Sequence, residues 1–438
     1  MRVHQTSDGR WRGGNRMRTM PDRDRSYYYG WNIVAICLVV QLCSVGIAMV
    51  SFSLFVPVWA KEWNTPASDV LLAISLFGWP GMLVGPIVGW AVDRMPANVM
   101  MSVGLLATAL SYAAVAAVHS SWMLIAVYLV LLCPSVTFCT AIPAQALASR
   151  WFDRHRGLAM GITASGLMIA GILYPQIVAH SLPVLGWRGI FLLGAAMLAF
   201  VVAPAAYFGL YDRPASADPR SILEFDKSVV AIRRESLSIP AILARPNFWL
   251  IAIAYMSMLA IFFSLEFNLA PIALSHGLDL VKASNLLSVM FVAALIALIA
   301  VGPIADRFGP RRAFIGLALL ASASATLFAF ADSEMALLLA VIPLGLVNAV
   351  WTLAPATLAV EFGSASFGRA FGLLSATTPV AMYTPHILAS LKEQTGGYTQ
   401  SLLVYAAIGL LGVVSIALMG RSKTPPKEAH AEEQSVPS

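Results

Sequence analysis

A short polar loop that occurs twice in this chain decides its fold. The later copy reads Gly302-Pro303-Ile304-Ala305-Asp306-Arg307-Phe308-Gly309-Pro310-Arg311-Arg312, and the earlier reads Gly85-Pro86-Ile87-Val88-Gly89-Trp90-Ala91-Val92-Asp93-Arg94. The two Asp-Arg pairs are 213 residues apart, and a nine-residue stretch beginning at Thr140 matches one beginning at Thr352 at an offset of 212. Two similar halves in the same orientation are therefore predicted.

The sequence around these loops is strongly apolar. The chain of 438 residues is 59% hydrophobic and 11% charged, and its mean hydropathy is +0.77. About 20 apolar residues span a bilayer as a helix, and lipid offers no partner for free backbone groups. Twelve spans are predicted, at 30–58, 70–91, 98–118, 122–147, 157–181, 189–211, 247–274, 283–305, 313–331, 335–360, 370–391 and 400–420. The predicted fold class is all-α, a polytopic membrane protein of twelve transmembrane helices in two six-helix repeats.

Basic residues predict the orientation. With a cytoplasmic N-terminus, 24 of the 28 Lys and Arg residues lie on the cytoplasmic side, which places both termini there. We expect a cell membrane, namely a bacterial inner membrane. The predicted segments are a basic cytoplasmic tail (1–28), an N-terminal half (29–211), a cytoplasmic linker (212–246), a C-terminal half (247–420) and a cytoplasmic tail (421–438). Residues 222–232 of the linker fit a helix on the membrane surface or a disordered tether.

Several other classes of function have no support in the sequence. The four cysteines all lie within predicted spans and are expected to be buried and free, not a disulfide framework or a zinc site. The net charge of +6 follows from topology and contact with the inner leaflet, so no nucleic-acid partner is expected. No nucleotide loop, metal cluster or nucleophile-base pair occurs, so neither an enzyme activity nor a cofactor is predicted.

The duplicated loop resembles the cytoplasmic loop motif of the major facilitator superfamily and stands at the two expected places. The resemblance covers essentially the whole chain, and it implies a secondary transporter that works by alternating access. It also implies that charges near the loops latch the cytoplasmic ends of the halves together in the outward-open state. The latch candidates are Asp93, Arg94, Arg150, Arg154, Asp306, Arg307, Arg311 and Arg312.

Two further stretches look like the oxalate/formate-antiporter and monocarboxylate-transporter branch of that superfamily. They are Tyr28-Tyr29-Gly30-Trp31 and the run from Arg150 to Gly161. This likeness implies a small organic acid moved by proton symport or exchange. Members of the branch commonly carry a substrate-pairing arginine in helix 8, where this chain has Leu298, and helices 1 and 11 also lack Lys and Arg. A neutral, protonated or weakly polar solute therefore remains an open alternative.

Glu266 is the one acidic residue of 22 that lies well inside a predicted span. Pairing Pro57 with Pro271 makes Phe52 its counterpart in the first half, so the duplicated scaffold does not require a carboxylate there. A carboxylate facing lipid is costly, so we expect Glu266 to face the cavity, together with Tyr255 on the same helix face, and to bind a proton or the solute. The alternative is a carboxylate capped by hydroxyls or placed in an outer vestibule.

Other polar residues within the spans complete the candidate site. His386 in helix 11 can bind an anion when protonated, or it can be an ordinary interfacial histidine. The repeat places Gln176 on the matching face of helix 5, with His180 one turn further. Weaker candidates, which can equally bond their own helix backbone, are Gln41, Ser44, Thr137, Thr140, Asn348 and Thr352.

The predicted function is secondary active transport of a small organic solute, with protons and the lipid bilayer as further partners. A proton-driven drug or metabolite exporter is the alternative, although helix 4 lacks the arginine that such exporters usually carry. A membrane sensor that does not transport is a third possibility, but it would need a signalling domain, and the tails are short.

Overall fold

The computed structural model describes residues 29–152, 156–212 and 237–420. Within these ranges every regular element is a helix, as the apolar runs predict. Arg154, both predicted tails and the linker stretch 222–232 lie outside the described residues.

The first half, residues 29–212, contains six helical stretches, several of which are divided. In chain order they are α1 (Gly30–Val45), η1 (Gly46–Val50) and α2 (Phe52–Trp63); α3 (Ala67–Ser75) and α4 (Gly78–Val92); α5 (Ala97–Ala116); α6 (Ser121–Val127), η2 (Tyr128–Leu132), α7 (Cys133–Cys139) and α8 (Ala141–Trp151); and α9 (Arg156–Met197), which continues through η3 (Leu198–Val202) and α10 (Ala203–Gly209). Gly186 interrupts α9 with a φ of +61°, a conformation that favours glycine, and so separates the fifth stretch from the sixth.

The second half, residues 237–420, has the same plan. Its stretches are the short α12 (Ile239–Leu243) with α13 (Pro246–Ser275); α14 (Leu280–Phe308); α15 (Pro310–Ala329); α16 (Glu334–Val347) with the beginning of α17 (Val350–Ser375); the rest of α17 with α18 (Thr378–Met382) and α19 (Thr384–Thr395); and α20 (Thr399–Leu418). Gly363, with a φ of +74°, divides α17 between the fourth and fifth of these stretches.

Ten helical segments within the described residues are long and apolar enough to cross a membrane. One of them, Gly157–Gly209, contains the break at Gly186 and so supplies two crossings. The stretch after Gly363 is divided into pieces that are each too short to count alone, and it makes the twelfth. The predicted all-α, polytopic architecture is confirmed.

Three helix breaks lie near the middle of the bundle. They separate α3 from α4, α16 from α17, and α17 from α18. Phe77 and Asn348 lie in the first two breaks, and Thr378 directly follows the third. Irregular backbone at membrane depth is tolerated where it lines a cavity, and all three residues do so.

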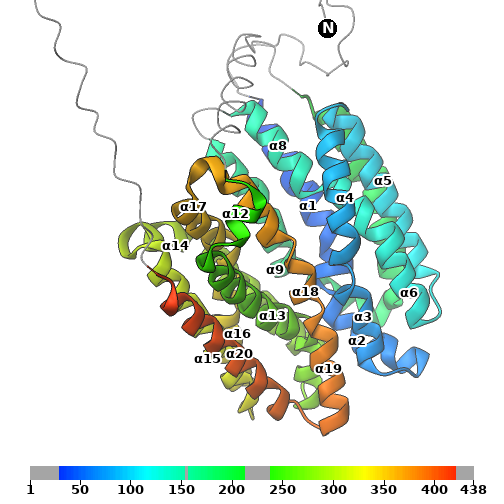
Figure 1. The fold of residues 1–438 in the computed structure, drawn as a ribbon. Helices are drawn as coiled ribbons and strands as arrows, with labels where there is room; N and C mark the ends of the chain where they lie inside the picture. The colour runs from blue at the N-terminus through cyan, green and yellow to red at the C-terminus, as the bar shows by residue number, and fades with distance from the viewer. Residues whose placement is uncertain (1–28, 153–155, 213–236, 421–438) are drawn as a thin grey trace, which may run out of the picture.

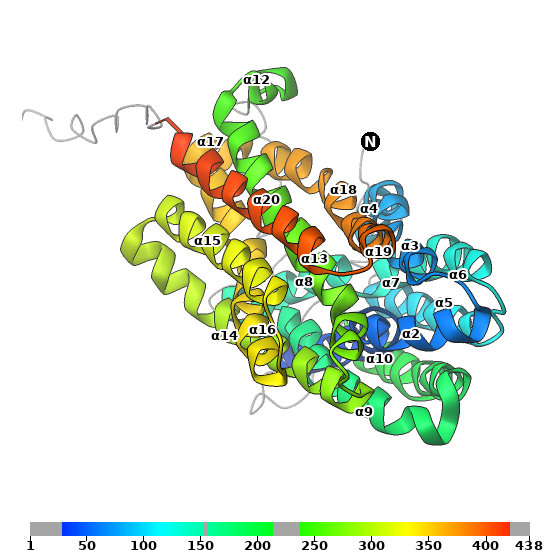
Figure 2. The same cartoon turned by 90° about the horizontal axis from the view of Figure 1, so that it is seen from below.

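The two halves pack against each other through a few helices. In the contacts between them, α9 runs along α14 and α2 runs along α13. α3 and α19 lie side by side at the bottom of Figure 1, and the view from below shows them together (Figure 2). We call this the closed end, and we call the opposite end, which carries Asp93 and Asp306, the loop-pair end.

Candidate functional site

Polar contacts between α3 and α19 join the halves at the closed end. The carboxylate of Glu393 accepts two hydrogen bonds from Ser68, from its backbone N–H at 3.1 Å and its hydroxyl at 2.7 Å. Nδ1 of His386 lies 2.9 Å from the carbonyl oxygen of Ser68, so this nitrogen carries the proton. The backbone N–H of His386 also donates to the hydroxyl of Ser75 at 3.2 Å.

A second set of contacts joins α9 to α14. Nε2 of Gln176 donates to Oδ1 of Asn285 at 2.9 Å and to the hydroxyl of Ser288 at 3.0 Å. The ring of Phe291 lies directly against Gly171, where any side chain would collide with it. The closed end is therefore held by direct packing as well as by hydrogen bonds.

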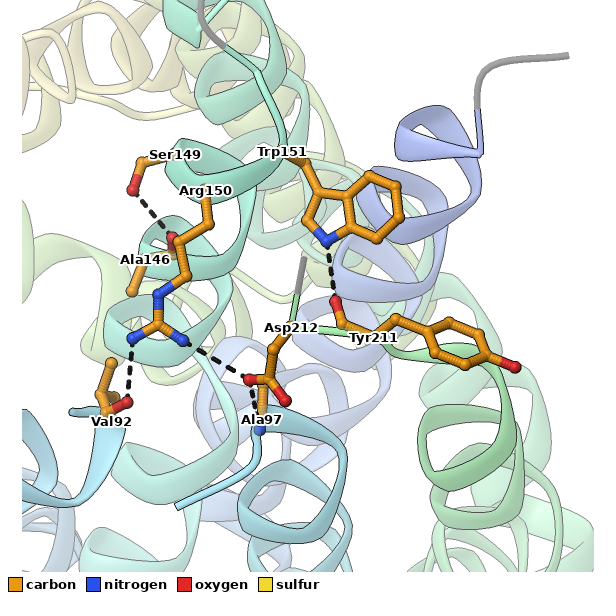
Figure 3. A network of polar contacts seen from close by, with 8 residues as sticks. All are labelled: Val92, Ala97, Ala146, Ser149, Arg150, Trp151, Tyr211 and Asp212. Atoms are coloured by element: carbon orange, nitrogen blue, oxygen red, sulfur yellow. Dashed lines mark hydrogen bonds and ion pairs between the residues drawn. The ribbon is translucent and has the colours of Figure 1, made fainter. Parts of the chain in front are cut away.

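The latch candidates are arranged differently at the loop-pair end. Arg150 donates to the carbonyl of Val92 at 2.9 Å and faces Oδ1 of Asp212 at 3.5 Å (Figure 3). The same carboxylate oxygen accepts from the backbone N–H of Ala97 at 2.9 Å and so caps α5. All four residues belong to the first half.

The other latch candidates that the structure describes also stay within their own half. Arg94 stacks over the ring of Trp90 at 4.4 Å, and Arg307 lies 5.5 Å from the ring of Phe308. Arg311 donates to two carbonyls at the end of α20, those of Ile416 at 3.2 Å and Ala417 at 2.8 Å. Asp93, Asp306 and Arg312 are exposed. Among the residues that the structure describes, these candidates form no bond between the halves, and the latch stays a prediction.

A cavity of about 320 Å³ lies between the halves. Residues of both halves line it: Met49, Val50, Phe77, Gly78, Gly81, Cys133, Thr137 and Leu167 from the first, and Phe262, Phe263, Glu266, Phe267, Phe291, Asn348, Trp351, Thr378 and Met382 from the second. No Lys, Arg or His is among these lining residues. Its volume falls within the usual range for small-molecule sites.

Glu266 is the only ionisable carboxyl among the lining residues. It is 6% exposed, and within the described part of the chain it makes no hydrogen bond or ion pair. Pro271 interrupts the hydrogen-bond ladder of α13 one turn later. Between Glu266 and Pro271, the backbone N–H of Ala270 donates to the hydroxyl of Ser53 in the first half at 2.8 Å. A carboxyl group is thus presented to the cavity beside a direct bond between the halves.

Aromatic rings form much of the cavity wall. The rings of Phe263 and Phe267 stack at 6.1 Å with an interplanar angle of 16°, and Trp351 lies 6.5 Å from Phe263. Tyr255 stands behind this wall with its ring edge-on to Trp351 at 6.0 Å, and its hydroxyl lies 3.1 Å from that of Thr378. Tyr255 therefore supports the wall and does not line the cavity.

The other predicted site residues are distributed over three places. Thr137 and Asn348 line the cavity, whereas Gln176 and His386 lie at the closed end. Gln41 donates to the backbone carbonyl of Thr163 at 2.7 Å within the first half. The other four candidates are not among the residues that line the cavity. Thr140 and His180 bond the backbone of their own helices. Ser44 contacts Cys139, and Thr352 is exposed. All four cysteines are buried and free.

The sequence interpretation missed residues of both the wall and the closed end. Phe263 and Trp351 line the cavity, but nothing in their local sequence distinguishes them from other apolar residues of the spans. Glu393 lies just past the predicted span 370–391 and is not among the candidates. Its spacing of seven residues from His386 puts both on one helix face, and this was the available signal.

Comparison with known proteins identifies the scaffold. The family model described as Major Facilitator Superfamily matches residues 35–284 and 267–437. Among solved structures, a bacterial homologue of the human lysosomal transporter Spinster, crystallised in an inward-facing, unoccupied conformation, superimposes with a TM-score of 0.67 at 14% identity, over 90% of this chain and 95% of that one. At this identity the likeness shows the fold alone.

Curated relatives match shorter parts of the chain. The riboflavin transporter RibJ of Trypanosoma cruzi is 33% identical over 125 residues, which are 27% of this chain and 25% of that protein. The uncharacterized MFS-type transporter YcxA of Bacillus subtilis is 24% identical over 168 residues, 37% of this chain and 40% of that one. The matches thus span between a quarter and two fifths of these two relatives.

Proposed function

Because the chain belongs to the Major Facilitator Superfamily, we propose that its central cavity carries a small organic solute across the membrane by secondary active transport with alternating access. The cavity supports this proposal because it lies between the halves and is lined by both. Polar contacts between the halves gather at the closed end, and the described latch candidates at the other end make no bond between the halves, so they would engage only when the halves rock.

We infer the conformational state of the structure from the membrane orientation that the basic residues predict. It makes the loop-pair end cytoplasmic, together with both termini, in a bacterial inner membrane. The closed end then faces outward, and the structure corresponds to an inward-facing state.

Glu266 is the observation that carries the proposal of proton coupling. A carboxyl group inside a membrane protein is retained mainly where it has a role, and this one is buried, partnerless among the described residues and turned to the cavity. We propose that it binds and releases a proton as the halves alternate. The nearby bond from Ala270 to Ser53 supports this proposal, because a bond between the halves must break when they separate.

The wall of the cavity favours one kind of solute. An organic acid is what the resemblance to the oxalate/formate-antiporter and monocarboxylate-transporter branch would imply, but the lining residues offer no cation to pair with a carboxylate. An organic acid would therefore enter in its protonated form or be held by the neutral polar groups of Asn348, Thr137 and Thr378. Stacked rings favour a flat, weakly polar or neutral molecule. The partial match to a riboflavin transporter agrees with a ring-containing solute.

A proton-driven exporter is the second candidate, and one observation favours it. A single carboxyl group surrounded by aromatic rings is also suited to an organic cation, which rings attract through cation–π interactions. Exchange of such a cation against a proton at Glu266 would then drive export.

Proteoliposomes test these proposals. We would measure uptake of labelled monocarboxylates, neutral flat-ring solutes and aromatic amines, each with and without an imposed pH gradient. The Glu266→Gln variant keeps the shape of the side chain but cannot exchange a proton, so we expect accumulation driven by the gradient to be lost while solute counterflow survives. Glu334→Gln is the matched control, since Glu334 forms an exposed ion pair with Lys282 away from the cavity. Full accumulation by Glu266→Gln would disprove the coupling role.

A further inference from the structure

A second cavity, of about 550 Å³, lies entirely within the second half. We call it the side crevice. Its lining residues come from α14, α15, α16 and α17: Ala297, Ala300, Val301, Ile304, Phe308, Arg312, Ala313, Gly316, Leu317, Leu320, Leu346, Ala349 and Leu353. Except for Arg312 they are all apolar. The central solute cavity shares none of these residues, so the side crevice has no place in the transport path described above.

The way the helices meet explains why this space is empty. α14 and α16 touch closely where Gly345 lies against the backbone carbonyl of Met290. Farther toward the loop-pair end, small residues such as Ala297, Ala313 and Gly316 face the space between the helices. A Cβ at Gly316 would meet no atom within 4 Å, so the space beside this residue is open.

The first half packs a longer side chain at one corresponding position. At the offset of 213, Ala297 corresponds to Val84 and Ala313 to Met100. Met100 is 1% exposed and forms a separate hydrophobic cluster with Val88, Ala91 and Val92, against which Val84, Met95, Phe138 and Ala146 pack. The second half has only the methyl group of Ala313 at that position, beside the crevice.

A positive charge accompanies the void. Arg312 lies at its mouth, is exposed, and makes no hydrogen bond or ion pair within the described part of the chain. Its counterpart in the first half is Val99. Arg307, next to the mouth residue Phe308, adds a second guanidinium. Arg312 is therefore a cation at the opening that the first half does not have, whereas Arg307 has its counterpart in Arg94.

We propose that the side crevice binds an acyl chain of an anionic phospholipid, with the phosphate of the headgroup at Arg312. In a bilayer, an apolar crevice on a membrane-spanning bundle is surrounded by acyl chains, and one of them buries the crevice wall. The guanidinium at the interface then forms charge-assisted hydrogen bonds with the phosphate. The lipid would cover in the second half the position that Met100 packs in the first.

Native mass spectrometry of the purified full-length protein tests this assignment. The protein is stripped of lipid in detergent and offered equal amounts of phosphatidylglycerol and phosphatidylcholine with identical acyl chains. We expect one phosphatidylglycerol to be retained in preference. Ala313→Met imports the side chain of the first half and should abolish retention, and Gly316→Val serves the same purpose if that variant does not fold. Arg312→Gln should lower the preference for phosphatidylglycerol about fivefold.

A matched control and a second measurement complete the test. Arg94→Gln removes an arginine from the corresponding loop of the first half, where Met100 is packed in a hydrophobic cluster, and should leave lipid retention unchanged. Added phosphatidylglycerol should raise the unfolding temperature of the unmodified protein but not that of Ala313→Met, since a ligand stabilises only a state that binds it. Undiminished retention by Ala313→Met would overturn the site. Equal retention of both lipids by the unmodified protein would overturn the role of Arg312.

Discussion

Replacing Glu393 by glutamine should weaken the closed end. The carboxylate accepts two hydrogen bonds from Ser68 across the interface, at 3.1 and 2.7 Å, and the amide offers one neutral oxygen in place of two charged ones. Hydrogen bonds to charged groups contribute about 1.5–3 kcal/mol each when buried. Because Glu393 is exposed, we expect about 1–2 kcal/mol for the pair, which changes the ratio of the two states by roughly 5- to 30-fold.

Spin labels on the two halves measure this change. Cysteines at the exposed positions Asn64 and Gln394, in a background without the native cysteines, carry the labels in proteoliposomes. We expect Glu393→Gln to increase the population with the longer distance. Glu334→Gln is the control, because it breaks an ion pair with Lys282 at 2.7 Å within one half. An unchanged distance distribution, or the same change in the control, would refute the reasoning.

Three further predictions concern topology, the loops and the solute. Cysteines at Ser120 and Ser333, the N-caps of α6 and α16, should react with an impermeant thiol reagent from outside, while cysteines at Ser221 and Ser435 should not; labelling from the opposite side would overturn the orientation. Asp93→Asn should slow or bias transport without changing the ranking of solutes, since this residue lies at the loop-pair end; an altered ranking at unchanged turnover would contradict a latch. Leu298→Arg should abolish transport of the native solute, because Leu298 is only partly exposed and lies outside the cavity lining, so an unpaired charge would be placed in an apolar region. Tighter carboxylate binding with preserved uptake would instead indicate an anion site.

The helical architecture was predictable because lipid imposes one simple rule on every crossing. Runs of apolar residues about 20 long, separated by charges, leave little freedom in assigning helices. The least regular crossing is the one after Gly363, where breaks before Thr378 and at Tyr383 divide the helix. The sequence predicts the apolar run there, but whether such a run bends depends on what it packs against.

The candidate site was predictable where a residue was chemically exceptional. Glu266 stands out because a carboxyl group inside a span is rare, and the structure places it on the cavity. The position of His386 and Gln176 along the membrane normal was harder to predict. Helical spacing shows which face of a helix a residue lies on, but not whether the opposite half contacts the helix at that level. The aromatic wall was missed because aromatic residues make up 10% of the chain and only tertiary packing selects those that face the cavity.

The bond from Ala270 to Ser53 lies close to the cavity, so the distance between the candidate site and a contact between the halves is short. It lies four residues after Glu266 on the same helix, a separation of about 6 Å along the axis at the usual helical rise. Occupancy of the cavity and separation of the halves can thus be linked by the strain of a single helical turn. In such an arrangement, a change at Glu266 acts on the contact between the halves through the backbone of one helical turn, and no chain of intervening side chains is needed to couple the two.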